Sequence, residues 1–149
     1  MTKHAPGAQE RFHDAPGFSI CRAARKIRRH LEGCFEPWGV TPPQWSALRF
    51  IGEGEGGVTQ ARLAELLEKD ANNVKTIVDR LEEKKLVERR PDGRDARVWR
   101  LALSKEGEAL YAEVSAIDDS FLEGLVQGVS DRDLAVFRRV LKRIEANAL

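Results

Sequence analysis

Apolar residues recur at intervals of three and four along most of the chain, the spacing of one face of an α-helix. The first such stripe lies within residues 18–36 and predicts an amphipathic helix there. Thr41–Pro43 is expected to open a second helix, because threonine is a good N-cap and proline is favoured in the first helical turn. Its apolar stripe extends to about Ile51, where a glycine-rich segment ends it.

Two short amphipathic helices follow, connected by a very short turn. Thr59 is placed to cap the first and Asp70 to cap the second, and only residues 68–70 separate them. Two short helices joined by so few residues are typical of a helix-turn-helix.

The apolar period then changes from 3.6 to 2, which indicates β-structure. Residues 86–90 and 97–103 are predicted as two strands, and the Pro-Asp-Gly segment at 91–93 is a turn signal between them. A β-hairpin directly after a helix-turn-helix predicts a winged helix. The fold class is therefore mainly α with a small β-wing.

Two longer helices are expected after the hairpin, capped by Ser104 and Ser130. Their apolar stripes, like the stripe within 18–36, lie outside the winged unit and must be buried against something. They either pack on one another or on the same helices of a second copy, which would give a two-fold dimer. The predicted organisation is a mobile tail (1–17), N-terminal helices (18–52), a winged helix-turn-helix (53–103) and C-terminal helices (104–149).

The net charge of +1 over 149 residues does not by itself suggest a nucleic-acid binder. The distribution is uneven, however. Residues 84–100 contain seven basic and three acidic side chains, a local +4, whereas residues 101–135 contain two basic and eight acidic ones, a local −6. The basic charge is concentrated on the hairpin and on the first long helix. Arginine outnumbers lysine, 17 to 8, which favours bidentate contacts with phosphates and base edges.

The sequence resembles the MarR-type transcriptional regulators over about residues 18–149. The segment DGRDAR at 92–97 carries the D-x-R-D-x-R signature of that family, and VTQARLAELL and VDRLEEKKLVERR resemble its helix-turn-helix. One departure is Lys85, where the family usually has glycine. Lys85 is expected either to extend the helix slightly or to adopt a positive φ. The resemblance implies a winged helix-turn-helix flanked by N- and C-terminal dimerisation helices, and a homodimer on a palindromic operator in double-stranded DNA.

The second helix of a helix-turn-helix presents its N-terminal side chains to base edges in the major groove, and asparagine and lysine there pair with adenine and guanine. Threonine, glutamine and arginine at the start of the supporting helix and on the second helix are placed for phosphates. In the wing, arginine suits a narrow minor groove, and Asp95 is expected to orient one guanidinium. The predicted DNA-binding residues are Thr59, Gln60, Asn72, Asn73, Lys75, Thr76, Arg80, Arg94, Asp95 and Arg97, of which Arg97 ranks first.

Members of this family generally repress transcription, and many are released by small phenolic or other aromatic acids held between the dimerisation helices and the DNA-binding lobe. The candidate ligand-binding residues are Trp45, Arg49, Arg22, Arg25, Arg29 and His30. Core packing is the alternative for Trp45, and a solvated face is the alternative for the arginines. Some relatives instead sense peroxides through a cysteine, so a thiol-based redox-sensing repressor using Cys21 is the alternative function.

Other classes of protein are disfavoured. No P-loop, HExxH, CxxC or GxSxG motif is present, so an enzyme is not expected, nor is a metal site or a cofactor. A winged helix that binds only proteins would leave the paired wing arginines unexplained. The chain has neither an apolar run of 18 residues nor a signal peptide, and it is expected in the cytoplasm.

Overall fold

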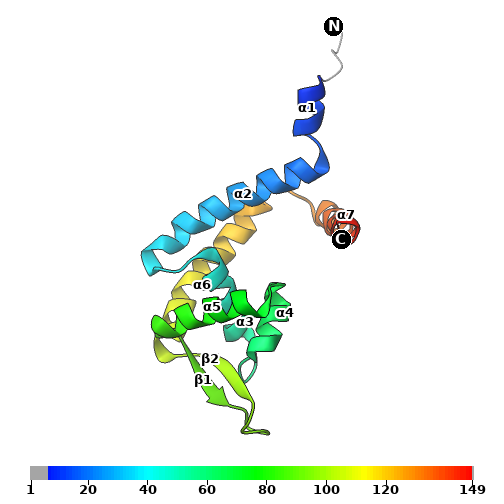
Figure 1. Ribbon diagram of the computed structural model, residues 1–149. Coiled ribbons are helices and arrows are strands. Elements are labelled where there is room, and N and C mark those ends of the chain that lie inside the picture. The colour runs from blue at the N-terminus through cyan, green and yellow to red at the C-terminus, as the bar shows by residue number, and fades with distance from the viewer. Residues whose placement is uncertain (1–6, 149) are drawn as a thin grey trace. The chain divides into compact units, whose positions relative to one another are not determined.

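The computed structural model describes residues 7–148 and has the predicted winged-helix architecture (Figure 1). The backbone forms two compact units, residues up to Ser115 and residues from Ala116 onward. Most residues are helical, and one two-stranded antiparallel sheet follows the helix-turn-helix, so the predicted fold class is confirmed. The elements are α1 (Ala8–His13), α2 (Pro16–Phe35), the 3₁₀ turn η1 (Glu36–Trp38), α3 (Pro42–Glu53), α4 (Gln60–Leu67), α5 (Ala71–Glu83), β1 (Val87–Pro91), β2 (Trp99–Leu103), α6 (Lys105–Leu125) and α7 (Asp131–Asn147).

The helices begin where the capping residues predicted. The Thr41 side chain accepts a hydrogen bond from the backbone N–H of Gln44 at the start of α3. Thr59, Asp70 and Ser130 cap α4, α5 and α7 in the same way, each with the residue three positions later. Because a capping bond satisfies an otherwise unpaired helical N–H, it determines the first residue of the helix.

The N-terminal boundary differs from the prediction. Within the segment expected to be a tail, residues 8–13 form the short helix α1, and α2 begins at Pro16 instead of residue 18. Proline at the first position of a helix has the required φ and lacks only an N–H that has no helical partner. Residues 1–6 of the predicted tail lie outside the described residues.

Both helices of the helix-turn-helix end in left-handed backbone. Glu68 closes α4 with φ +51°, and Lys85 follows α5 with φ +59°. Lys85 therefore adopts the positive φ that glycine usually supplies, at a cost of about 1 kcal/mol relative to glycine. The reversal directs the chain from α5 into β1, and the Lys85 carbonyl accepts a hydrogen bond from the Ser104 hydroxyl.

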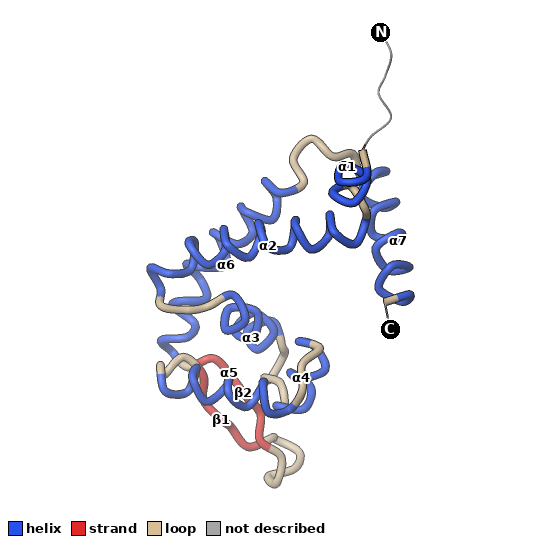
Figure 2. Tube along the Cα trace, turned by 45° about the horizontal axis from the view of Figure 1, so that its top comes forward, coloured by secondary structure: helices blue, strands red, loops and turns tan. Residues whose placement is uncertain are grey.

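The hairpin pairs β1 with β2 from Val87 opposite Leu103 to Pro91 opposite Trp99. Val58, just before α4, forms an antiparallel bridge with Leu101 on the other edge of β2. Figure 2 shows the hairpin lying beside α4 and α5. The wing is therefore attached to the helix-turn-helix through the sheet as well as through the chain.

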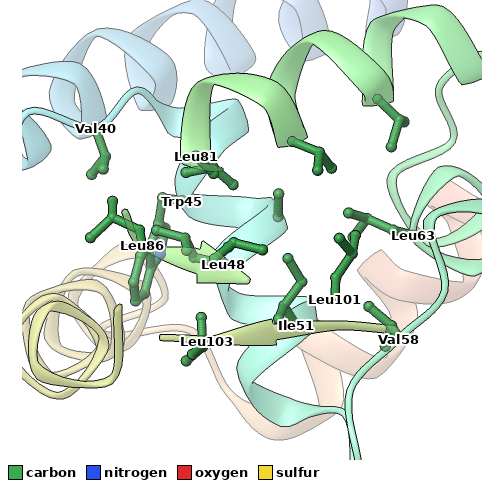
Figure 3. Packing of buried hydrophobic residues seen from close by; sticks show 14 of the residues in the cluster. Val40, Trp45, Leu48, Ile51, Val58, Leu63, Leu81, Leu86, Leu101 and Leu103 are labelled. Carbon is green, nitrogen blue, oxygen red and sulfur yellow. The ribbon is translucent and has the colours of Figure 1, made fainter. Parts of the chain in front are cut away.

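The core lies between α3, α5 and the hairpin, as Figure 3 shows. The predicted stripe of α3 is buried, with Trp45, Leu48 and Ile51 at most 3% exposed. Val74 and Val78 of α5 are also fully buried. This packing holds α5 rigidly and leaves its opposite face to solvent.

Candidate nucleic-acid interface

The exposed face of α5 carries the side chains predicted to read bases. Asn72, Asn73, Lys75 and Thr76 are all exposed, whereas Val74 between them is fully buried. The helical period thus separates a core face from a polar face at the N-terminal end of α5. Arg80 continues the polar face one turn further along.

Local bonds order these polar side chains without covering them. Lys75 forms an ion pair with Asp79 at 2.5 Å, and Arg80 forms one with Glu83 at 3.0 Å. Exposed pairs of this kind contribute little free energy, so the cations are free to exchange a carboxylate for a phosphate or a base edge.

The cap of α5 is a carboxylate. Asp70 accepts the backbone N–H of Asn73 at 2.9 Å, and this hydrogen bond, together with the Asn73 side-chain amide, lowers the pKa of Asp70 below its ordinary value of 3.8. Asp70 therefore caps α5 as an anion at neutral pH, and Asn73 is held at the first turn.

Hydrogen bonds connect the start of α4 to α5 and to the hairpin. The Thr59 hydroxyl accepts the N–H of Arg62 at 3.1 Å, and the Gln60 side-chain oxygen accepts a hydrogen bond from Arg89 of β1 at 3.1 Å. Arg89 also bonds Glu82 of α5 at 2.6 Å. Arg89 thus joins α4, α5 and the hairpin. We did not predict this role, because it depends on three elements that meet only in the folded chain.

The wing presents Arg97 on a carboxylate support. Asp95 accepts the Arg97 backbone N–H at 3.0 Å and the guanidinium through Nε at 3.1 Å and Nη2 at 3.2 Å. The predicted carboxylate–guanidinium pair is therefore present, yet the Arg97 side chain is 90% exposed. The guanidinium, followed by the backbone N–H, lowers the pKa of Asp95 below 3.8. The pair is pre-formed and faces solvent, which is the geometry needed to meet an external anion.

The remaining wing arginines divide into two kinds. Arg100 donates to the Gly57 carbonyl at 3.1 Å and pairs with Asp92 at 3.3 Å, so it fastens the hairpin to the segment before α4. Arg94 is exposed, and only its backbone N–H is bonded to Asp92, at 3.5 Å. Arg90 of β1 is also exposed but pairs with Glu88 on the same strand at 2.5 Å. Arg94 and Arg97 are therefore the arginines directed to solvent from the turn of the wing, as the motif predicts.

Replacing Asp95 with asparagine tests the support directly. Asp95→Asn keeps an oxygen for the backbone N–H but removes the charge that holds the guanidinium. DNA affinity is therefore expected to fall about three- to tenfold, which is the cost of ordering one long side chain.

The contribution of Asp95 should not change with pH near neutrality. Because folding lowers the pKa of Asp95, the Asp95–Arg97 pair is fully formed above the ordinary pKa of an aspartate and is lost only as the pH falls through the lowered value. Between pH 8 and pH 5, the affinity measured by fluorescence anisotropy should therefore show no pH dependence that is due to Asp95, and the loss in Asp95→Asn should be the same at every pH. A stepwise loss of wild-type affinity across that range that is absent in Asp95→Asn would contradict the assignment.

The six candidate ligand-binding residues do not converge on one cavity. Trp45 is 3% exposed, with its ring centroid 5.7 Å from that of Phe35 and 5.6 Å from that of Tyr111, so it packs in the core. Arg49 pairs with Glu53 one turn along α3. The others line α2, where Arg22 and Arg25 lie against the Phe18 ring and where Arg29 and His30 are exposed.

A cavity of about 700 Å³ lies instead between the C-terminal half of α2 and residues 39–43. None of the six candidates lines it. One of its walls contacts the end of α5, because the ammonium of Lys84, the residue that follows α5, bonds the Gly39 carbonyl and, at 2.8 Å, the Gln44 side chain. The sequence offered no signal for this contact, which joins residues about 40 positions apart.

The cysteines form no disulfide. Cys21 is an exposed thiol on α2, and Cys34 is half-buried on the same helix. Among the described residues, no helix is long and apolar enough to cross a membrane.

Comparison with known proteins finds the same architecture. The sequence profile of the MarR family matches residues 38–98. The HTH-type transcriptional regulator YwoH of Bacillus subtilis, itself uncharacterised, is 32% identical over 123 residues, which cover 83% of this chain and 88% of that protein. Among solved structures, the Staphylococcus aureus MepR–DNA complex has a TM-score of 0.84 at 20% identity, covering 91% of this chain and 97% of that one. CouR from Rhodococcus jostii RHA1, bound to p-coumaroyl-CoA, has a TM-score of 0.80 at 27% identity, covering 88% and 92%.

Proposed function

Because the chain belongs to the MarR family of winged-helix transcriptional regulators, we propose that it is a dimeric, sequence-specific DNA-binding repressor released by a small aromatic or phenolic acid. The observation that carries the DNA-binding part is the pre-formed wing pair, in which Asp95 holds an arginine that is 90% exposed. The polar face of α5 adds side chains suited to base edges. MepR, which shares the fold, was solved as a complex with DNA.

In the proposed complex, α5 enters the major groove with Asn72, Asn73, Lys75 and Thr76 toward the bases. Thr59, Gln60 and Arg80 contact phosphates, which set the register of α5 without reading sequence. Arg97 and Arg94 enter the adjacent minor groove or contact its phosphates. Each half-site thus receives one recognition helix and one wing.

The C-terminal unit supports a dimer. None of the 17 residues of α7 is buried, although Val136, Phe137 and Val140 are large and apolar, and Phe137 is 57% exposed. Leu122 and Leu125 near the end of α6 are also about half exposed. Apolar surface of this extent on a monomer indicates an interface. A second copy of the chain would cover this surface in a two-fold symmetric dimer, and that symmetry matches a palindromic operator.

Two observations support the proposal that an aromatic acid releases the protein from DNA. CouR is a neighbour of known structure with a bound p-coumaroyl-CoA. The cavity beside residues 39–43 contacts the end of α5 through Lys84, so a ligand that shifts Gly39 would also shift the recognition helix. Arg28, Glu32 and Glu36 are the charged residues that line the cavity.

Selection from a pool of duplexes with a randomised core of about 30 base pairs tests the proposal, because that length holds two half-sites one helical turn apart. We expect enrichment of an inverted repeat and, by sedimentation, a protein mass twice 16.7 kDa. Hydroxybenzoates and hydroxycinnamates added to the complex are expected to release the DNA. The absence of any enriched sequence would refute specific DNA binding, and a monomer mass on DNA would refute the dimer.

A further inference from the structure

Trp99 is an exposed aromatic side chain in the basic segment 84–100, whose local charge is +4. It is 53% exposed, whereas Trp45 is buried and the Trp38 indole N–H donates to Glu113 at 2.8 Å. Among the described residues, the Trp99 indole has no hydrogen-bond partner. A half-exposed tryptophan with a free N–H presents an apolar ring and one donor to whatever binds there.

The strand register places Trp99 on the core-facing side of the hairpin. Side chains alternate along a strand, so Trp99 shares a face with Leu101 and Leu103, both of which are buried. Pro91 is its partner on β1 and lies on the same face. Trp99 and Pro91 therefore continue the apolar face of the hairpin past the edge of the core and into solvent.

That end of the hairpin also approaches the start of α4. Val58 pairs antiparallel with Leu101, so the chain after Val58 runs toward the Trp99 end of β2. Arg89, two residue pairs inward from Pro91 and therefore on the same face, reaches Gln60 at 3.1 Å. Trp99 thus lies on the side of the wing that faces the first residues of α4, between them and the wing tip.

We propose that Trp99 is a DNA-contacting residue that packs its ring on a deoxyribose of the operator backbone and donates its indole N–H to an adjacent phosphate oxygen. The positive charge around Trp99 favours DNA as the partner that covers its exposed ring. The neighbours Arg97 and Arg100 belong to a segment of local charge +4, so a second copy of the hairpin would be repelled, whereas a polyanion is attracted. The sugar–phosphate backbone supplies both an apolar surface and an acceptor. This inference rests on the proposed DNA binding and adds an uncharged contact to it.

Binding of the selected duplex to Trp99→Ala tests the contact. We expect an affinity loss of about 30-fold for a dimer, because each wing loses one apolar contact and one hydrogen bond. Trp99→Phe, which keeps the ring but not the donor, should lose about fivefold. The slope of log affinity against log salt should stay at the wild-type value in both variants, because no cation is removed. Phe12→Ala, which removes a 66%-exposed aromatic on α1, serves as the matched control and should bind as wild type.

Intrinsic fluorescence locates the contact. Acrylamide should quench Trp99 more readily than the other tryptophans in free protein, and the duplex should protect it. Trp99→Phe should bind DNA without that protection.

The possible outcomes separate this inference from the proposed function. Wild-type protein that binds no duplex, even at low salt, overturns the proposed function. If Trp99→Ala binds DNA with an affinity within about twofold of wild type, the contact is overturned, because the loss of even one hydrogen bond would lower the affinity by more than that. A reduced salt slope in Trp99→Ala would also overturn it, because the substitution would then act through the arginines.

Discussion

Arg97→Ala is expected to weaken operator binding about 100-fold while leaving the fold intact. Removing one direct arginine contact costs about 1.4 kcal/mol, a factor of ten, and a dimer on a palindrome loses two such contacts. The side chain is 90% exposed and its only described hydrogen bonds are to Asp95, so the variant creates no cavity and leaves no buried group unpaired. Thermal unfolding should therefore be unchanged.

The salt dependence distinguishes direct contact from an indirect effect. Each phosphate neutralised by a cation contributes about 0.9 to the slope of log affinity against log salt, so Arg97→Ala should reduce the slope by about 2 per dimer. Lys105→Ala is the matched control, since it removes the same charge at the far end of β2 from the wing tip. Equal losses in the two variants would mean that Arg97 acts only through net charge, and unchanged affinity would remove it from the interface.

The helix starts and the wing were predictable because their causes are local. A capping side chain bonds a residue only three positions away, so Thr41, Thr59 and Asp70 indicate their helices without knowledge of the fold. Asp95 and Arg97 are two residues apart, and their pairing likewise needs only the turn between the strands.

The features that escaped prediction depend on residues distant in sequence. Arg89 acquires its role only when α4, α5 and β1 are assembled, and Lys84 reaches Gly39 across 45 positions. Trp45 illustrates the converse: its helical spacing suited both a ligand wall and a core position, and only the packing of Phe35 and Tyr111 around it shows that it lies in the core.

At Gly107, helix propensity and tertiary packing predict opposite effects of an alanine substitution on stability. Glycine inside a helix is ordinarily less favourable than alanine by about 1 kcal/mol, so helix propensity alone predicts that Gly107→Ala stabilises α6. In the folded chain, however, a Cβ at Gly107 would lie 2.0 Å from the carbonyl oxygen of Leu86. That oxygen also accepts the N–H of Ser104, so neither the backbone of α6 nor the start of the hairpin can yield without breaking bonds.

Gly107→Ala is therefore expected to lower the free energy of unfolding by about 3–5 kcal/mol, combining overpacking with loss of the buried Ser104 bonds to Gly107 and Lys85. Because such domains have only about 5–15 kcal/mol of stability, the melting temperature should fall by about 10 °C or more. Calorimetry at one fixed protein concentration measures this, since unfolding of a dimer depends on concentration. Gly124→Ala in the same helix has no atom within 4 Å of the added Cβ and should leave the stability unchanged or raise it by up to about 1 kcal/mol. Two variants with the same melting temperature would show that the close approach of α6 to Leu86 does not constrain the fold.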